Sequence, residues 1–159
     1  MAVALATTIA GCGSSDGNVD VGPDGGGSTG VTISTGTLSG KIGGRDWTFA
    51  AGQTVAALST ADRIWVDLYA TTFDACVGFG APTNADEVIM MMPRTPGDYA
   101  VTLNLNATLY DAAGNSNNVA TRGRLVIDSI TATEITGGLH ITYNGDNTVD
   151  GQFQATICP

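Results

Sequence analysis

Cationic side chains are scarce in this sequence. Its 159 residues include six Lys and Arg against fifteen Asp and Glu, which gives a formal net charge of −9. The six cations are scattered, with no cluster larger than Arg122 and Arg124. A surface that binds nucleic acid needs basic side chains to neutralise phosphates, so nucleic acid is not expected as a partner. Anionic lipid headgroups also repel the folded part, so membrane contact has to be covalent or apolar.

Histidine is nearly absent, and this limits the catalytic possibilities. The single histidine, His140, lies between Leu139 and Ile141 in a predicted strand and is expected on the opposite, solvent-facing side. A Ser-His-Asp or Cys-His site would have to use it, but no serine or cysteine has supporting context. Because C-x-x-C is also missing, the sequence predicts no catalytic residue, no metal and no cofactor.

Long apolar runs are missing too, and the one short run stands at the start. The opening MAVALATTIAGCGSSDG changes abruptly at Cys12 from apolar residues to Gly, Ser and Asp. A transmembrane helix needs about 20 apolar residues, so this run is too short to span a bilayer. We interpret residues 1–11 as an export signal, incomplete at its start because no basic residue precedes Asp16. The alternative is an apolar N-terminus with an incidental cysteine.

The segment Ile9-Ala10-Gly11-Cys12 resembles the lipobox of bacterial lipoproteins. The resemblance implies cleavage before Cys12 and acylation of its sulfur and its new amino group. Several acyl chains together anchor a protein stably, whereas one alone is marginal. Gly13, where an Asp would favour the inner membrane, implies an outer-membrane location by analogy with enterobacterial sorting.

The rest of the chain divides into a linker and a domain. GSSDGNVDVGPDGGGSTG (13–30) has almost nothing to bury, so it is predicted to be a flexible, disordered tether. Residues 31–36 are a transition that can add an edge strand. The predicted parts are therefore the signal, an acylated cysteine with its linker over 12–36, and a domain over 37–159.

Short alternating segments separated by turn residues fill the domain. The expected strands are 38–42, 45–49, 63–70, 87–93, 98–105, 123–130, 138–143 and 148–157. No segment keeps a helical period for three turns. We predict an all-β fold, an antiparallel β-sandwich of about 7–9 short strands, with a small barrel as the alternative.

The C-terminal end resembles the last hairpin of small uncharacterised lipoproteins from Gram-negative bacteria. The resemblance rests on Gly151, Phe153, Ala155 and Cys158, in a G-x-F-x-A-x-x-C pattern, and on the opening GKIGGRDWTF. It covers roughly residues 37–159 and carries no assigned activity.

The cysteines predict one crosslink. With Cys12 assigned to lipid, Cys76 and Cys158 remain, and export implies an oxidising compartment. We expect a disulfide between them that stabilises the domain by roughly 4–5 kcal/mol through loop entropy. Two independent buried thiols are the alternative.

One strand offers a candidate binding face. Trp65, Asp67 and Tyr69 alternate with apolar residues in RIWVDLYA, so they share one side of the strand. Flat rings beside a carboxylate are typical of a sugar-binding surface. The alternative is that both rings favour strands and pack beneath a loop or second sheet.

These observations predict an envelope lipoprotein held to the lipid bilayer through Cys12. Its domain is expected to have a binding or structural role without enzymatic activity, with a glycan or an envelope protein as partner. Two alternatives stay open. One is a carbohydrate-binding or adhesion module that uses Trp65, Asp67 and Tyr69, and the other is a hydrolase with a carboxylate pair.

Overall fold

The computed structural model describes residues 30–77 and 81–159. The strands are β1 (Ser39–Ile42), β2 (Arg45–Thr48), β3 (Ala51–Thr54), β4 (Arg63–Tyr69), β5 (Glu87–Pro93), β6 (Gly97–Val101), β7 (Ala107–Asp111), β8 (Ser116–Ala120), β9 (Gly123–Ile130), β10 (Glu134–Asn144) and β11 (Asn147–Thr156). The helical segment of this part is a single 3₁₀ turn, η1 (Ala56–Leu58). None of the described residues forms a helix long and apolar enough to cross a membrane.

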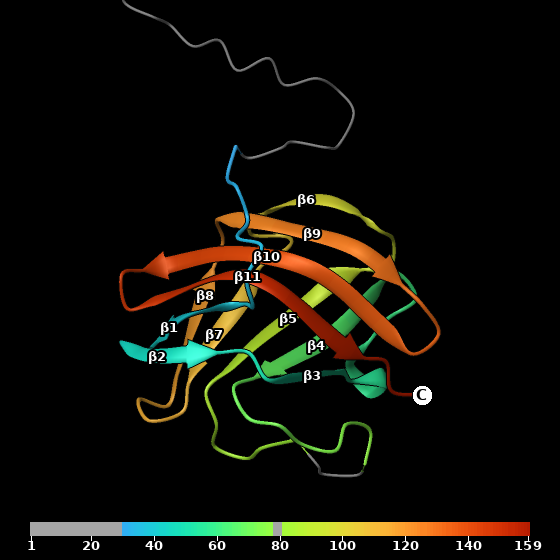
Figure 1. The fold of residues 1–159 in the computed structure, drawn as a ribbon, viewed down its shortest axis with the longest axis horizontal. Coiled ribbons are helices and arrows are strands. Elements are labelled where there is room, and N and C mark those ends of the chain that lie inside the picture. The colour runs from blue at the N-terminus through green and yellow to red at the C-terminus, as the bar shows by residue number, and fades with distance from the viewer. Residues whose placement is uncertain (1–29, 78–80) are drawn as a thin grey trace, which may run out of the picture.

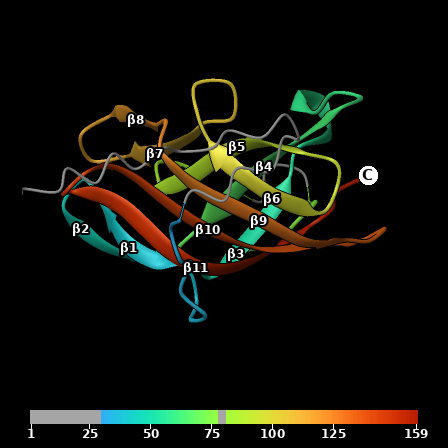
Figure 2. The same cartoon turned by 90° about the horizontal axis from the view of Figure 1, so that it is seen from above.

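The eleven strands belong to one sheet that curls round a shared core and is nearly closed. Its order is β6-β9-β10-β11-β3-β4-β5-β7-β8, with the β1–β2 hairpin attached to β11. Figure 1 shows β9, β10 and β11 in front of β4 and β5, and Figure 2 shows these two layers edge-on. The predicted all-β sandwich is therefore confirmed. Three strands that the sequence did not indicate, β3, β7 and β8, raise the count above the expected range.

Strand β11 connects the layers because it has partners along both edges. It pairs with β10 over most of its length, with β1 near its start (Ser39↔Asp150), and in parallel with β3 at its end (Thr156↔Gln53). Between these points, the Leu38 amide donates to the carbonyl of Gln152 at 2.8 Å. The last strand of the chain thus holds the first strands in place.

The core is made by inward-facing residues of both layers. Alternation puts every second side chain of each strand between the layers. The largest fully buried side chains are Leu38, Ile42, Leu68, Met92, Leu109, Leu125, Ile127, Ile135, Leu139, Ile141, Val66 and Val88.

Turn chemistry fixes the β1–β2 hairpin. Gly43 and Gly44 have φ values of 58° and 75°, which a type I′ turn requires and which side chains disfavour. The Gly43 amide donates to Oδ1 of Asn147 at 2.8 Å, and the Gly44 amide donates to the carbonyl of Asp146 at 2.9 Å. The β1–β2 turn therefore packs against the turn that joins β10 to β11.

A second set of contacts joins this hairpin to the other layer. The Arg45 guanidinium donates to Asp86 at 2.7 Å and to Asp111 at 2.6 Å. The indole Nε1 of Trp47 donates to the carbonyl of Asp86 at 3.1 Å, and the Ala112 amide donates to the Asp86 carboxylate at 2.9 Å. These bonds hold β2 against the ends of β5 and β7.

Two expected segments differ from the structure. The strand predicted over 98–105 ends at Val101, and the next residues form a loop in which Leu103 is 79% exposed. Residues 31–36 do not add a strand but lie along the sheet, where the Ser34 amide donates to Asp150 at 3.0 Å. In both places polar and glycine residues allow loop contacts to replace strand pairing.

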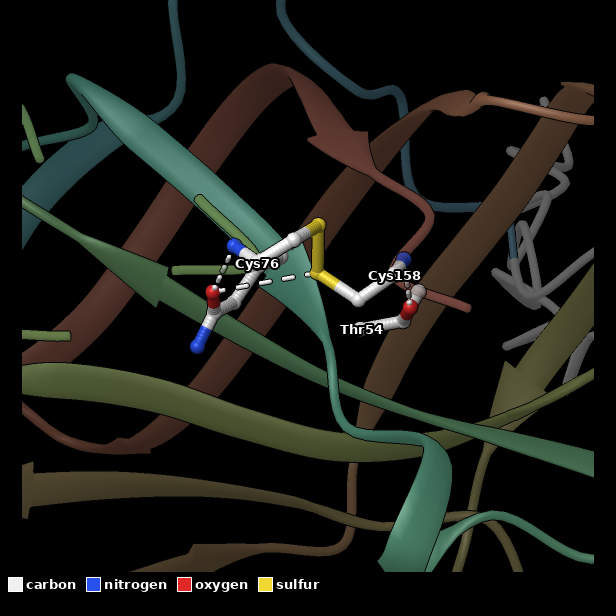
Figure 3. The surroundings of a disulfide bond; sticks show 4 residues. Thr54, Cys76 and Cys158 are labelled. Carbon is white, nitrogen blue, oxygen red and sulfur yellow. Dashed lines mark hydrogen bonds between the residues drawn. A yellow bond between two sulfur atoms is a disulfide. The ribbon is translucent and has the colours of Figure 1, made fainter. Parts of the chain in front are cut away.

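The predicted disulfide is present between Cys76 and Cys158, which are 82 residues apart in the sequence and 5.1 Å apart at their Cα atoms. Strand β3 positions both cysteines (Figure 3). The Cys76 amide donates to Oε1 of Gln53 at 3.1 Å, and the Cys158 amide donates to Oγ1 of Thr54 at 2.8 Å. The bond ties the β4–β5 loop to the segment that follows β11.

Removing this crosslink should destabilise the domain. In the double variant C76A/C158A, we expect the free energy of unfolding to fall by up to about 4.5 kcal/mol, because the unfolded chain regains loop entropy. Urea unfolding followed by circular dichroism measures the change. The reduced native chain is the matched control and should unfold with the variant, whereas an unchanged midpoint in both would contradict the prediction.

Candidate functional site

Strand β4 places the three predicted binding residues on one face, because the apolar residues between them are buried in the core. Trp65 and Asp67 are half-buried, and Tyr69 is 5% exposed. The period of two therefore predicted the shared face correctly. The three side chains nonetheless differ in how much surface they offer to a ligand.

Trp65 and Asp67 are joined by a hydrogen bond. The indole Nε1–H of Trp65 donates to Oδ1 of Asp67 at 2.7 Å. This bond fixes the ring beside the carboxylate. It also occupies one of the carboxylate oxygens that would otherwise accept a hydrogen bond from a ligand hydroxyl.

Tyr69 is covered, as the packing alternative predicts. It lies opposite Glu87 in the β4–β5 register. Its ring packs edge-on against Phe73, with centroids 5.3 Å apart and planes at 86°. Trp65 therefore offers ring surface on this face, and Tyr69 does not.

Two carboxylates meet on the same face. Asp67 lies opposite Ile89, and Glu87 stands two residues before Ile89 on the same side of β5. Burial raises the pKa of Asp67 to about 6, against a smaller opposing effect of the hydrogen bond from Trp65. Burial also raises the pKa of Glu87, and the nearby charge of Asp67 adds to this increase. The pair holds protons more tightly than exposed carboxylates do.

The contacts of Asp67 and Glu87 can be compared with what the hydrolase alternative requires. Acid–base hydrolysis needs two carboxyl groups on either side of a substrate bond. Here Asp67 accepts a hydrogen bond from Trp65, and Glu87 lies opposite Tyr69 in the strand register. The bond from Trp65 occupies one oxygen of Asp67, and it leaves the hydrolase alternative open.

An open cleft of about 650 Å³ lies beside Met91, the strand partner of Trp65. We call it the Arg63 cleft, and it is lined by Arg63, Met91, Asn104 and Asn106. Trp65 lies directly opposite Met91 in the strand register. Nη1 of Arg63 donates to the carbonyls of Met91 at 3.3 Å and Asn104 at 3.1 Å, which holds the guanidinium at the cleft. The guanidinium and the two amides thus lie together, next to the residue that pairs with Trp65.

His140 points away from the core, as predicted. Leu139 and Ile141 beside it are fully buried, and its Nδ1 lies 3.4 Å from Oδ1 of Asp150. It is on β10, in the opposite layer from Trp65. Across residues 30–77 and 81–159, no group of three or more His, Cys, Asp or Glu side chains is placed to hold a metal ion.

The predicted lipidation site, Cys12, lies outside the described residues, as do the signal over 1–11 and most of the linker. The structure places Cys76 and Cys158 together and puts Trp65 beside Asp67. Sequence reasoning missed Glu87 and Arg63. A period-two reading of EVIMMMP would place Glu87 on the outer face, but no sequence signal gave the register that brings it to Asp67.

No protein-family model matches this chain, and no curated protein or solved structure matches it either. The chemistry of the site is therefore argued from its own side chains. These are one guanidinium and two amides around an open cleft and, on the strand paired with Met91, one half-buried indole that is hydrogen-bonded to a carboxylate. Such a set suits reversible binding of a polar molecule with a flat apolar face.

The raised pKa of Asp67 predicts a pH effect on stability. A carboxyl group whose pKa is higher in the folded state binds its proton more tightly there, so stability is lost as pH rises from about 4 to 6. Asp67→Asn keeps an acceptor for Trp65 but removes the charge. At pH 7 we expect it to be more stable than the native chain by about 1–2 kcal/mol, after a discount for partial exposure.

Urea unfolding at pH 4, 5, 6 and 7 measures this effect, and the advantage of Asp67→Asn should disappear by pH 4. Asp128→Asn is the matched control, because it removes a carboxylate from an exposed position on β9 and reports the effect of net charge alone. A constant difference between Asp67→Asn and the native chain at every pH would refute the assignment.

Proposed function

We propose that this protein is a lipid-anchored component of a bacterial cell envelope whose β-domain is a non-enzymatic binding module. The observation that supports this most is the division of the three cysteines. Cys76 and Cys158 form a disulfide, which leaves Cys12, preceded by Ile9-Ala10-Gly11, for a separate modification. The lipobox pattern supplies that modification as acylation.

The disulfide also supports an exported location. Disulfides form and persist in oxidising compartments and are rare where thiols are kept reduced. The formal net charge of −9 argues against adsorption to anionic lipid, so acyl chains are the more suitable anchor. An outer-membrane location follows from Gly13 in the same proposal.

The path of residues 31–36 suits an anchor at the N-terminal side. Nη1 of Arg124 donates to the carbonyl of Val31 at 2.8 Å, and Nε2 of Gln152 donates to the carbonyl of Ser34 at 2.8 Å. These bonds hold the chain against the outer face of β9, β10 and β11 (Figure 2). The face with Trp65 belongs to the other layer, so in this proposal it is turned away from the anchored side.

Acylation at Cys12 is tested by metabolic labelling. The full-length gene is expressed in its native host with radiolabelled palmitate, and label is expected in the native chain and in C76A but not in C12A. The C76A variant controls for loss of a cysteine without loss of the acylation site. An unlabelled native chain, or label that persists in C12A, would overturn the anchor.

Carbohydrate binding is a second candidate, favoured by the position of the Arg63 cleft beside Met91, the strand partner of Trp65. An indole covers the apolar face of a sugar ring, while amides and a guanidinium bind its hydroxyl groups. Asn104 and Asn106 supply the amides in the lining. Tyr69 has no part in this version of the site, because it is covered.

A glycan panel tests this candidate. A sugar that binds the full chain should lose affinity by about tenfold or more in Trp65→Ala, because ring stacking is lost. Tyr143→Ala is the control, since Tyr143 is an exposed aromatic residue on β10 in the opposite layer. If no panel member binds, or if both variants bind as the native chain does, the candidate is rejected.

A further inference from the structure

A second concavity lies beside the C-terminal segment of the chain. This segment ends on the right in Figure 1. The volume of the concavity is about 450 Å³, within the range of small-molecule sites. It lies between η1, the residue that follows β5, the β9–β10 turn and the C-terminal segment. We call it the Arg94 cavity.

Three isoleucines give this cavity apolar walls. Ile64 is 4% exposed and belongs to the core, while Ile130 and Ile157 are partly buried and pack against the core. The wall formed by Ile157 is held firmly. Its amide donates to the carbonyl of Thr133 at 2.8 Å, and the next residue, Cys158, is bound by the disulfide. The apolar surface is therefore built into the fold.

Arg94 provides the single charge in the lining. Its Nε donates to the carbonyl of Thr60 at 2.9 Å, which holds the guanidinium next to another lining residue. No carboxylate lines the cavity, and among the described residues Arg94 forms no salt bridge.

The hydroxyl groups of the lining already serve the fold. Oγ of Ser59 donates to the carbonyl of Val55 at 2.9 Å and accepts from the Trp65 amide at 2.9 Å. Oγ1 of Thr60 accepts from the Arg63 amide at 3.1 Å. The Nη groups of Arg94 are thus the polar groups best placed for a ligand. A guanidinium can donate two parallel hydrogen bonds to a carboxylate.

We propose that the Arg94 cavity binds an amphipathic carboxylate, a medium-chain fatty acid, with its aliphatic chain on the three isoleucines and its carboxylate on Arg94. The walls disfavour a ligand that is polar throughout. Only an apolar group gains free energy when it displaces water from the three isoleucines. The guanidinium excludes a cationic head. This site is independent of the anchor at Cys12 and of the Trp65 face.

The test uses the full chain and three probes, titrated by calorimetry below the micelle-forming concentration. Decanoate should bind. Decanol, which lacks the charge, and acetate, which lacks the aliphatic chain, should each bind at least about tenfold more weakly, since each loses one of the two contacts. Equal affinity for decanol would refute the role of Arg94, and equal affinity for acetate would refute the apolar walls.

Variants locate the site. Arg94→Gln should weaken decanoate binding by about tenfold or more, whereas Arg94→Lys keeps the charge and should recover part of it. Arg122→Gln is the matched control, because Arg122 is an exposed arginine at the opposite end of β9. Decanoate that does not bind the native chain, or that binds Arg94→Gln as tightly, overturns the proposal. Because the anchor is tested by labelling at Cys12, failure here leaves that result unaffected.

Discussion

The disulfide between Cys76 and Cys158 is the constraint on which the functional parts of this domain depend. It joins the loop after β4 to the segment after β11, and side chains of β3 accept hydrogen bonds from both cysteine amides. The C-terminal segment so fixed forms one wall of the Arg94 cavity. The β4–β5 loop, which the disulfide also holds, brings Phe73 against Tyr69.

The same bond connects the fold to a cellular setting. A crosslink across 82 residues stabilises a domain only where thiols stay oxidised, which is the setting that the lipobox-like segment also implies. Residues 31–36 lie along the β9–β11 layer, and the Trp65 face belongs to the other layer. In the proposed function, the anchor lies on the side of β9–β11 and the binding face on the other, so that a tethered module meets its ligand away from the membrane.

Much of the fold could be predicted because alternation and turn residues act locally. The alternation of β4 and the Asn-Gly turn before β11 gave the right strands, and Trp65 and Asp67 were found together because they are two residues apart. Strand β3 was missed because its four residues, AGQT, show no clear alternation of apolar and polar side chains, although Gly52 is a strand residue where a side chain would collide with Leu68. Register between strands is not local, so nothing in the sequence indicated that Glu87 approaches Asp67.

The most direct test of the account is a peptide mass analysis of the protein recovered from its native host, with free thiols alkylated before digestion and no reductant present. One spectrum reports the state of all three cysteines. The account predicts a peptide pair linked through Cys76 and Cys158 and an N-terminal peptide that begins at Cys12 with added acyl mass. Alkylated Cys76 and Cys158, or an unmodified Cys12 still preceded by Gly11, would contradict it.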